Sequence, residues 1–415
     1  MSGRTHHHRV VVAATTGSFH LMALAPLLLL AACGAPPRPS LDAEQFRARA
    51  AEQKAATKQT TKEAVAKLMA RIERDASNHR PVINILAISG GGDWGAFGSG
   101  FLRGWGECAD TAKRRPDFDV VTGVSTGSLI APFAFINTDE AILTVDEIYR
   151  NPSADWVESH GMLSIMPWNP SFVTIDGLRK TIDDAASPEF IRTLAQESSE
   201  GKVLLVAATD LDLGCQQVWD VGEAAELAVA AGDTRGITDY VFASSAIPVA
   251  FPSIMIDPGL YADGCLTANV LLRLDARSPE GFVRRWREVH PDQPLPSVRY
   301  WIIINNQLAH IPKTVQRRWA DVLGPALDVS MRSGTIAQVQ LLASQADFVN
   351  AALDGDVEVR LVAIPDDWRP PVEGLFKQET MRSLSDLGRR MGEDPNSWQL
   401  WAAPQLHQPA AATAR

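Results

Sequence analysis

The hydrophobic positions along the chain predict alternating strands and helices. Val82 to Ile88 is an apolar, β-branched run bounded by turn residues, which is typical of a buried strand. A helix is expected from about Ala96 to Cys108. Later in the chain, Tyr300 to Asn305 is apolar on both faces, as a central strand is, and Thr314 to Asn350 has hydrophobic residues at helical spacing. This alternation predicts an α/β domain.

Weaker hydrophobic patterns predict three further strands and a short helix in the same domain. Lys202 to Ala208 indicates a strand with an antiparallel partner at Gln216 to Val221. Val357 to Ile364 alternates between apolar and polar residues as a half-buried strand does, and Leu384 to Met391 predicts a short helix. The domain is therefore expected to continue close to the end of the chain.

The chain of 415 residues is long enough for one large domain or two smaller ones. We expect four segments: a lipoprotein signal peptide at residues 1–32, a lipidated tether and helical spacer at 33–80, the main domain at 81–393, and a disordered tail at 394–415. The tail is rich in Ala, Gln and Pro, a composition that cannot bury a core.

Charge and cysteine usage exclude several classes of protein. The formal net charge of -10 argues against a nucleic-acid-binding protein, which would carry a basic face. Besides Cys33, the cysteines are Cys108, Cys215 and Cys265, with no C-x-x-C pair. This pattern indicates neither a zinc site nor a disulfide framework, and we expect no catalytic metal and no cofactor. Buried thiols are expected, and one disulfide among the last three cysteines is left open.

The N-terminal segment has the features of a secretory signal. Two arginines precede a mostly apolar run from Val10 to Leu30. The sequence Leu30-Ala31-Ala32-Cys33 then resembles the lipobox of bacterial lipoproteins, in which the cysteine is lipidated and becomes the mature N-terminus. The resemblance implies a membrane anchor at Cys33 and a place in the bacterial cell envelope. Gly34 after the cysteine favours the outer membrane, facing the periplasm. An uncleaved membrane helix is the alternative.

A long helix is expected between this anchor and the main domain, from Ser40 to about Asp75. The segment is rich in Ala, Lys, Glu, Gln and Arg, which are good helix formers. Its apolar stripe is sparse and becomes denser only in the second half. We therefore expect a solvated spacer helix, with a dedicated partner-binding helix as the alternative.

One serine stands in a turn that suits a nucleophile. Asp119 to Leu129 indicates a β-branched strand, a sharp turn and a helix, with Ser125 between Gly123 and Gly127. This is the G-x-S-x-G pattern of a nucleophile elbow. The glycines let the strand and the helix approach closely, so that the hydroxyl projects from a strained turn near backbone amides. Ser125 is the candidate nucleophile, and an ordinary turn is the alternative when the motif is taken alone.

A glycine-rich turn precedes the elbow by one strand–helix unit. Gly90, Gly91 and Gly92 follow the first strand and precede a helix, so their unhindered amides lie at the positive end of the helix dipole. No Gly-Lys-Ser/Thr ending supports a phosphate loop, and a dinucleotide-binding turn fits poorly because its spacing requires overlapping glycines. With a serine elbow downstream, we expect these three amides to form an oxyanion hole.

Together these motifs resemble the patatin-like phospholipase family. The matching segments lie between about Ile83 and Val270 and are, in chain order, Gly90-Gly91-Gly92-Asp93-Trp94-Gly95, Gly123-Val124-Ser125-Thr126-Gly127, Ala207-Ala208-Thr209-Asp210-Leu211, Ala243-Ser244-Ser245-Ala246-Ile247-Pro248 and Tyr261-Ala262-Asp263-Gly264. The resemblance implies a three-layer α/β/α fold with a mainly parallel central sheet, and lipid acyl hydrolase activity. It also implies a Ser–Asp dyad, in which Asp263 is the general base for Ser125.

Two positions depart from the family pattern. The family's glycine loop carries Arg or Lys just before its last glycine, whereas this chain has Trp94. The third position of the D-G-[GA] signature is Cys265, which is still small. The first departure removes a positive charge near an anionic head group and so weakens the case for a phospholipid substrate more than the case for the chemistry.

Alternatives remain open for both the base and the function. A Ser–His–Asp triad would need a late histidine, for which His290, His310 and His407 are eligible by order, and His160 is the weakest candidate. The expected partners are a lipid or ester substrate and the membrane. A carboxylesterase for small soluble esters and a non-catalytic lipoprotein scaffold that works through protein partners are the other two functions.

Overall fold

The computed structural model describes residues 38–74, 80–159, 171–248, 250–256, 258–271, 281–310, 312 and 314–402. The expected signal peptide, the lipidation site Cys33, and the candidate histidines His160 and His407 lie outside these ranges.

In the described part of the chain, nine strands form one central sheet. Their order is β11-β10-β9-β1-β2-β5-β8-β7, and β6 pairs with β5. The five strands from β10 to β5 in this order are parallel, whereas the outer pairings are antiparallel. The strands of the sheet are β1 (Val82–Ile88), β2 (Val120–Val124), β5 (Val203–Asp210), β6 (Cys215–Asp220), β7 (Ile254–Ile256), β8 (Gly259–Asp263), β9 (Ser297–Gln307), β10 (Asp356–Ile364) and β11 (Gln399–Leu400). A separate hairpin pairs β3 (Glu158–Ser159) with β4 (Val173–Thr174).

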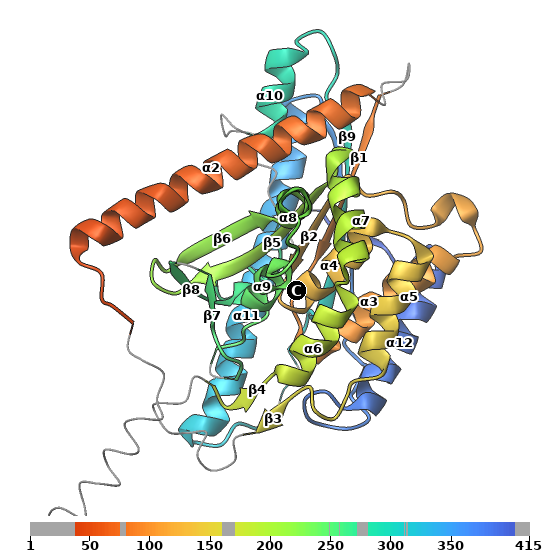
Figure 1. Cartoon of the computed structure of the whole chain (residues 1–415). Coiled ribbons are helices and arrows are strands. Elements are labelled where there is room, and N and C mark those ends of the chain that lie inside the picture. The colour runs from red at the N-terminus through yellow and green to blue at the C-terminus, as the bar shows by residue number, and fades with distance from the viewer. Residues whose placement is uncertain are drawn as a thin grey trace, which may run out of the picture.

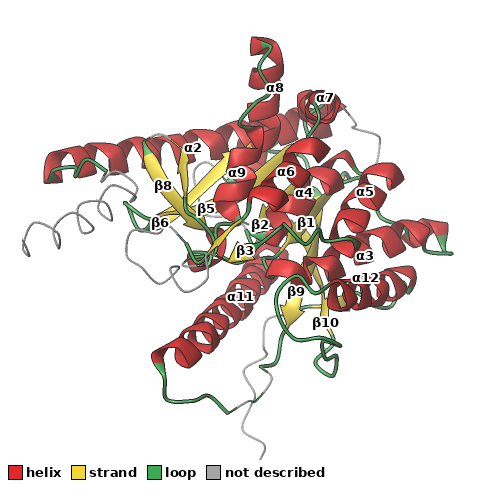
Figure 2. Cartoon of the chain, turned by 60° about the horizontal axis from the view of Figure 1, so that its bottom comes forward, coloured by secondary structure: helices red, strands yellow, loops and turns green. Residues whose placement is uncertain are grey.

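Helices cover both faces of this sheet (Figure 1, Figure 2). One core contains residues of α3 to α9 and α12, and a second core on the opposite face contains residues of α2, α10 and α11. The expected three-layer α/β/α fold with a mainly parallel sheet is therefore confirmed. The helices are α2 (Ala43–Arg74), α3 (Gly95–Glu107), α4 (Thr126–Ile136), α5 (Asp139–Arg150), α6 (Asp176–Ala185), α7 (Pro188–Ser199), α8 (Val221–Ala231), α9 (Ile237–Ser244), α10 (Phe282–Val289), α11 (Trp319–Ala352) and α12 (Gln378–Glu393), with 3-10 turns η1 (Gly92–Trp94), η2 (Thr111–Lys113) and η4 (Gly264–Leu266).

Strand β1 shows why the sequence forms a central parallel strand. Leu86 and Ile88 enter the first core, while Ile83 and Ala87 enter the second. Side chains alternate between the two faces of a strand, so a strand that is buried on both faces is mainly apolar. The polar residue of β1, Asn84, is only partly buried and accepts a hydrogen bond from Trp301 Nε1 at 3.1 Å. The predicted limits of β1 are those observed, and β9 likewise follows from its apolar run, although it extends further at both ends.

The expected disordered tail is wrong for residues 394–402. Strand β11 pairs antiparallel with β10. Trp398 packs among three aromatic rings, with centroid distances of 5.1 Å to Phe101, 4.8 Å to Trp105 and 5.0 Å to Trp301. This aromatic contact anchors a segment whose average composition is too polar to predict a fold.

The expected solvated spacer is also wrong, because α2 packs against the domain. Arg49 Nη2 lies 2.5 Å from Asp210 Oδ2, and both side chains are buried. Near the other end of the helix, Leu68, Met69 and Ile72 are buried in the second core. The apolar stripe of α2 is thin along most of its length, but its dense second half and a buried ion pair are enough to dock it.

Helices α3 and α12 pack with their backbones in contact. A Cβ at Gly100 would lie 2.1 Å from the carbonyl oxygen of Ser385, and one at Gly104 would lie 2.0 Å from that of Arg389. On α12, a Cβ at Gly388 would lie 2.2 Å from the carbonyl oxygen of Phe97. Glycine is needed at these positions because any side chain would force the helices apart.

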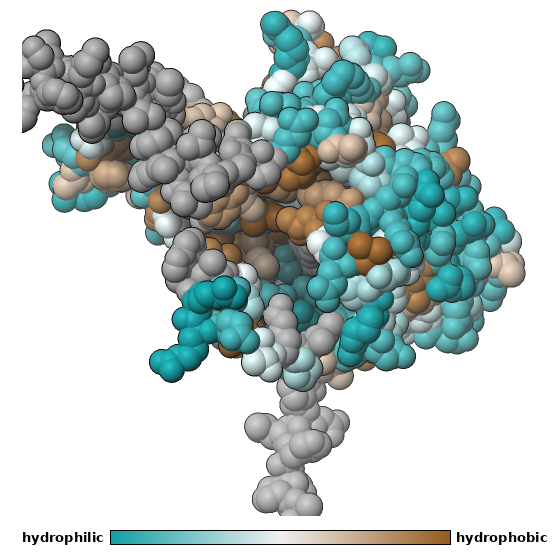
Figure 3. Space-filling view, turned by 90° about the horizontal axis from the view of Figure 1, so that it is seen from below, coloured by the Kyte–Doolittle hydropathy of each residue, from teal (hydrophilic) through white to brown (hydrophobic). Residues whose placement is uncertain are grey.

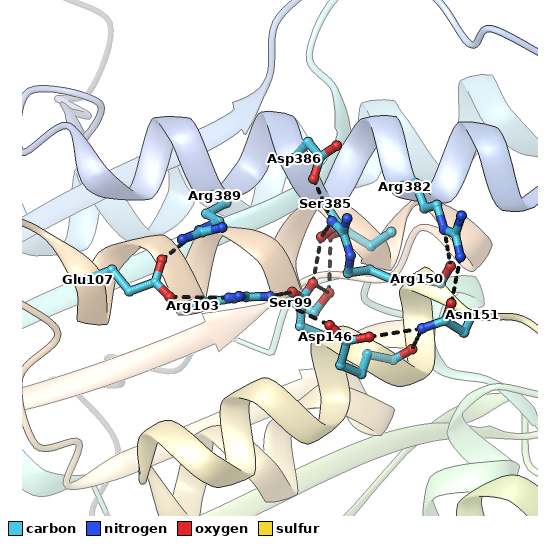
Figure 4. A network of polar contacts seen from close by, with 12 residues as sticks. Ser99, Arg103, Glu107, Asp146, Arg150, Asn151, Arg382, Ser385, Asp386 and Arg389 are labelled. Carbon is cyan, nitrogen blue, oxygen red and sulfur yellow. Dashed lines mark hydrogen bonds and ion pairs between the residues drawn. The ribbon is translucent and has the colours of Figure 1, made fainter.

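A polar network ties the same two helices to α5 (Figure 4). The Asp146 carboxylate of α5 is fully buried and accepts hydrogen bonds from Ser99 and Arg103 of α3 and from Ser385 of α12, at 3.2, 3.0 and 2.6 Å. At the end of α5, Arg150 Nη1 lies 2.5 Å from an Asp386 carboxylate oxygen. A buried carboxylate with three partners is satisfied, so this cluster is structural.

We predict that Gly104→Ala lowers the free energy of unfolding by about 1–3 kcal/mol, because its methyl group would meet the α12 backbone. Gly334→Ala is the matched control, since no atom lies within 4 Å of a Cβ at Gly334 in α11. That control should raise stability by up to about 1 kcal/mol, the difference in helix propensity. Urea unfolding of both variants checks the prediction, and effects of the same sign would contradict it.

Candidate active site

Ser125 occupies the turn between β2 and α4. Its backbone has φ 52° and ψ -127°, a combination that residues with a side chain rarely adopt. A Cβ at Gly123 would lie 2.3 Å from the carbonyl oxygen of Gly127, and one at Gly127 would lie 2.2 Å from that of Ile88. Both glycines are therefore needed for β1, β2 and α4 to approach this closely. The geometry is that of a nucleophile elbow.

Strand register brings Asp263 to this turn. β2 and β8 pair with successive parts of β5, so that Val124 lies opposite Ala207 and Asp263 lies opposite Ala208. Ser125 Oγ is 2.7 Å from Asp263 Oδ2, although the two residues are 138 positions apart in the chain. Their exposed fractions are 4% and 0%, so the hydrogen bond is shielded from solvent. The hydroxyl and the carboxylate named from the sequence thus meet.

The Asp263 carboxylate is held in place and desolvated. Its Oδ1 accepts a hydrogen bond from the Cys265 amide at 2.9 Å, which leaves Oδ2 for Ser125. Burial disfavours the ionised form and raises the pKa of Asp263 from its ordinary value of 3.8 to about 6, while the hydrogen bonds from Cys265 and Ser125 oppose the shift. Such a group is ionised at neutral pH and is a stronger base than an ordinary carboxylate.

Two serines at the end of α9 hold the elbow. Ser244 Oγ accepts a hydrogen bond from the Ser125 amide at 2.9 Å and donates one to the Ala207 carbonyl at 2.6 Å. Ser245 Oγ donates to the Ser125 carbonyl at 3.0 Å. The motif at residues 243–248 can be recognised in the sequence. The hydrogen bonds of its two serines cannot, because their partners are backbone groups of Ser125 and Ala207, which are distant in the chain.

The glycine loop lies beside Ser125, but its three amides are not equivalent. A Cβ at Gly90 would lie 2.9 Å from the Ser125 Cβ, which places the loop against the nucleophile. The Gly90 amide, however, donates to the carbonyl oxygen of Asn269 at 3.3 Å. Among the hydrogen bonds that join described residues, none uses the amides of Gly91 or Gly92. Of the three amides expected to bind an oxyanion, that of Gly90 is therefore engaged with Asn269, whereas those of Gly91 and Gly92 have no partner among the described residues.

Asn305 at the end of β9 supports this loop. Its amide donates to Ser89 Oγ at 2.8 Å, and its side-chain Nδ2 donates to the Ser89 carbonyl at 2.9 Å. A Cβ at Gly91 would lie 2.1 Å from the Asn305 carbonyl oxygen, so the loop rests directly on β9. In the sequence, Asn305 stands out only as a polar residue at the end of an apolar run. That pattern does not indicate that it supports the glycine loop.

Neither described histidine contacts the Ser–Asp pair. His290 Nε2 lies 2.8 Å from Glu73 Oε1, and His310 Nδ1 lies 3.3 Å from Asp328 Oδ2. Within the described residues, no cluster of three or more His, Cys, Asp or Glu side chains is placed to hold a metal ion. The three cysteines in these ranges are unpaired thiols.

Comparison with known families adds to this geometry. The sequence matches the patatin-like phospholipase family over residues 86–275, a range that contains the glycine loop, Ser125 and Asp263. The chain carries a patatin-like phospholipase domain. The protein is therefore an enzyme, a lipid acyl hydrolase.

Two solved structures are similar to this chain at low identity. The crystal structure of VipD from Legionella pneumophila is 11% identical over 79% of this chain and 69% of its own, with a TM-score of 0.34. The type III effector protein ExoU is 13% identical over 78% of this chain and 55% of its own, with a TM-score of 0.23. No curated protein sequence matches the chain significantly.

The glycine loop of this patatin-like domain has an apolar side chain at its last position before Gly95. The Trp94 ring packs edge-on against Trp368, with the ring centroids 5.2 Å apart. The neighbouring Asp93 is buried, accepts a hydrogen bond from the Phe376 amide at 2.9 Å, and has its pKa raised to about 6 by burial. The two residues fasten the loop to the segment at 368–376.

We predict that Ser125→Gly is more stable to unfolding than Ser125→Ala, by about 1–2 kcal/mol. Glycine relieves the backbone strain at a positive φ, whereas alanine retains it. Both variants lack the hydroxyl, so comparing their urea unfolding curves isolates the backbone term. Equal stabilities would show that the turn is unstrained.

Proposed function

We propose that this protein cleaves carboxylic esters of lipids, as a phospholipase A or lysophospholipase does, through a dyad of Ser125 and Asp263. The observation that carries this proposal is the 2.7 Å hydrogen bond between Ser125 Oγ and Asp263 Oδ2 in a buried site beside the glycine loop. The family match supports the reaction class, and the geometry supports the role proposed for each residue.

The reaction follows from these positions. Asp263 accepts the Ser125 hydroxyl proton while Oγ attacks the ester carbonyl carbon. The negative charge that develops on the carbonyl oxygen is stabilised by the free amides of Gly91 and Gly92. The alcohol leaves with the proton from Asp263, and an acyl group remains on Ser125. Water, deprotonated by Asp263, then attacks the acyl carbonyl. The bond to Ser125 Oγ breaks, the carboxylic acid is released, and Asp263 returns the proton to Oγ.

An apolar hollow on one side of the molecule supports a lipid substrate. Seen from below, the surface is hollowed near its centre, and hydrophobic residues gather around the hollow (Figure 3). Apolar surface around a hollow suits acyl chains. The second candidate, a carboxylesterase for small soluble esters, is favoured by Trp94, which offers an anionic head group no positive charge. Chain-length profiles with p-nitrophenyl esters separate the two, since a lipid enzyme prefers long chains.

A membrane anchor at Cys33 is part of the proposal. It rests on the lipobox-like sequence before Cys33. No helix in the described ranges is both long enough and apolar enough to cross a bilayer. We place the enzyme in the bacterial cell envelope, lipid-anchored at the outer membrane and facing the periplasm.

We predict that Ser125→Ala and Asp263→Asn each lower kcat/KM for a lipid ester by at least about 10²–10⁴-fold. In the wild type, kcat/KM should rise with pH and level off above about 6, because the base must be ionised and burial raises the pKa of Asp263 to about 6. A pH–rate profile of the free enzyme checks this, and a fluorophosphonate probe should label Ser125.

Stability separates loss of the base from loss of the fold. Because the folded pKa of Asp263 is raised, the stability that its protonated form provides is complete below about pH 4 and is lost as the pH rises through about 6. Asparagine avoids this loss, so Asp263→Asn should unfold at pH 8 with equal or greater free energy than the wild type, by up to about 3 kcal/mol. Retained activity in Asp263→Asn, or its loss on replacing His160, His290, His310 or His407 by alanine, would overturn the dyad.

We predict that Cys33→Ala abolishes incorporation of an alkyne-labelled fatty acid during bacterial growth, because the thiol is the expected acceptor. Cys215→Ala is the matched control and should be labelled like the wild type. Labelling that persists in Cys33→Ala would contradict the anchor and leave the hydrolase assignment untouched.

A further inference from the structure

A large cavity lies under α2, on the sheet face opposite the first core. Its volume is about 720 Å³, which falls within the roughly 300–1,000 Å³ of typical small-molecule sites. The cavity is bounded by α2 above, by β6 and the start of α10 at the sides, and by the sheet below. Figure 1 shows α2 crossing the sheet in this way.

The floor of the cavity consists mainly of apolar side chains from four strands. β1, β2, β5 and β9 each contribute two residues that are two positions apart, such as Ile83 and Ile85 in β1 and Val203 and Leu205 in β5. Residues spaced by two lie on one face of a strand, so these four adjacent strands together form one continuous, mainly apolar surface. Most of these residues are buried in the second core, whereas Ile85 and Leu205 are partly exposed and border the open space.

The cavity is held open because α2 is fixed at both ends. At its start, Arg49 pairs with Asp210 and Asp212 at 2.5 and 2.8 Å. Near its end, Arg71 pairs with Asp119 at 2.9 Å, and Lys67 pairs with Glu226 at 2.9 Å. The α2 residues that line the cavity lie between positions 50 and 68, a length of roughly 27 Å at 1.5 Å per residue. The ion pairs at both ends hold this part of the helix over the sheet, while Ala64, Val65 and Leu68 near its end pack against the second core.

The cavity is separate from the catalytic pair. Val124, Ala207, Val218 and Leu271 form a small buried cluster, of which Val218 and Leu271 line the cavity. On the other side of this cluster, a Cβ at Gly264, next to Asp263, would lie 2.9 Å from Val124 Cγ1. The cluster therefore forms a wall between the cavity and the site of ester cleavage. The roof is also separate, because α2 precedes the region that matches the family.

One part of the cavity wall is polar and suits an anion. Lys54 and Lys58 lie one helical turn apart on α2, are exposed, and line the cavity. Beside them, Gln53 Nε2 lies 3.5 Å from the Gln216 carbonyl oxygen, which places β6 against this turn of α2. The Gln216 side-chain amide nitrogen, also in the cavity lining, is buried and has no partner among the described residues. A buried N–H donor without an acceptor is unfavourable, and an oxygen atom of a ligand could accept its hydrogen bond.

We propose that this cavity binds one long-chain fatty acid, with its chain under α2 and its carboxylate at Lys54, Lys58 and Gln216. An extended apolar chain matches the elongated, apolar floor, and a carboxylate matches two ammonium groups and an unpaired amide donor. The site is distinct from the ester-cleaving site, so the proposal does not depend on the catalytic roles of Ser125 and Asp263.

Filling the cavity tests this directly. The full-length protein is first reacted with a fluorophosphonate to block Ser125, and binding of cis-parinaric acid and its displacement by oleic acid are followed by fluorescence. Ala64→Trp and Thr57→Trp place an indole in the cavity from two positions on its roof and should each weaken binding about tenfold or more. Ala66→Trp and Ala56→Trp, exposed on the same helix, should bind like the wild type.

Lysine variants test the proposed binding of the fatty-acid carboxylate separately. Lys54→Gln together with Lys58→Gln should weaken displacement by oleic acid about three- to tenfold and leave displacement by oleyl alcohol unchanged. Lys62→Gln, exposed and outside the cavity lining, is the control. The proposal is overturned if both tryptophan variants fold, as judged by thermal melting, and still bind like the wild type. It is equally overturned if phosphonylation of Ser125 alone removes all binding.

Discussion

The hydrogen bond between Ser125 Oγ and Asp263 Oδ2 is the contact around which the fold is arranged. It exists because β2 and β8 meet end to end along β5: Val124 and Asp263 lie opposite successive residues of that strand. A shift of β8 by one residue would turn the Asp263 side chain to the other face of the sheet. The antiparallel pairing of β8 in a mainly parallel sheet directs the carboxyl ends of two strands toward each other, and this brings Ser125 and Asp263 together.

Several features that disfavour folding gather around that contact. Ser125 has a strained backbone, Asp263 is a buried carboxylate with a raised pKa, and Gly91 and Gly92 have amides without partners among the described residues. Each is unfavourable for the folded state, and each is what an acyl-transfer site needs. The surrounding structure compensates through backbone-directed hydrogen bonds, such as those of Ser244 and Asn305, and through tight helix packing away from the site.

The sequence predicted the parts of this arrangement that have a local signal. An apolar run defined β1, and two glycines around a serine defined the elbow, because both depend on neighbours within a few residues. The pairing of Ser125 with Asp263 came from resemblance, since nothing local indicates that residues 138 apart will touch. The docking of α2 was missed for the same reason. Its thin stripe suggested a solvated helix, and its buried ion pair joins Arg49 to a residue 161 positions later.

The Ser–Asp pair and the cavity occupy different parts of the sheet. Ser125 and Asp263 stand at the carboxyl ends of their strands, whereas the cavity lies over the amino-terminal halves of β1, β2, β5 and β9 on the face that α2 covers. If α2 served only to cover the sheet, its side chains could have packed flat on those strands, and the space above the floor would be filled. Instead the helix is clamped by charges at both ends and leaves an apolar space beneath its middle, with lysines and an unpaired amide at one part of the wall. A helix that only covers the sheet does not need that space, whereas a helix that also encloses the proposed acyl chain does.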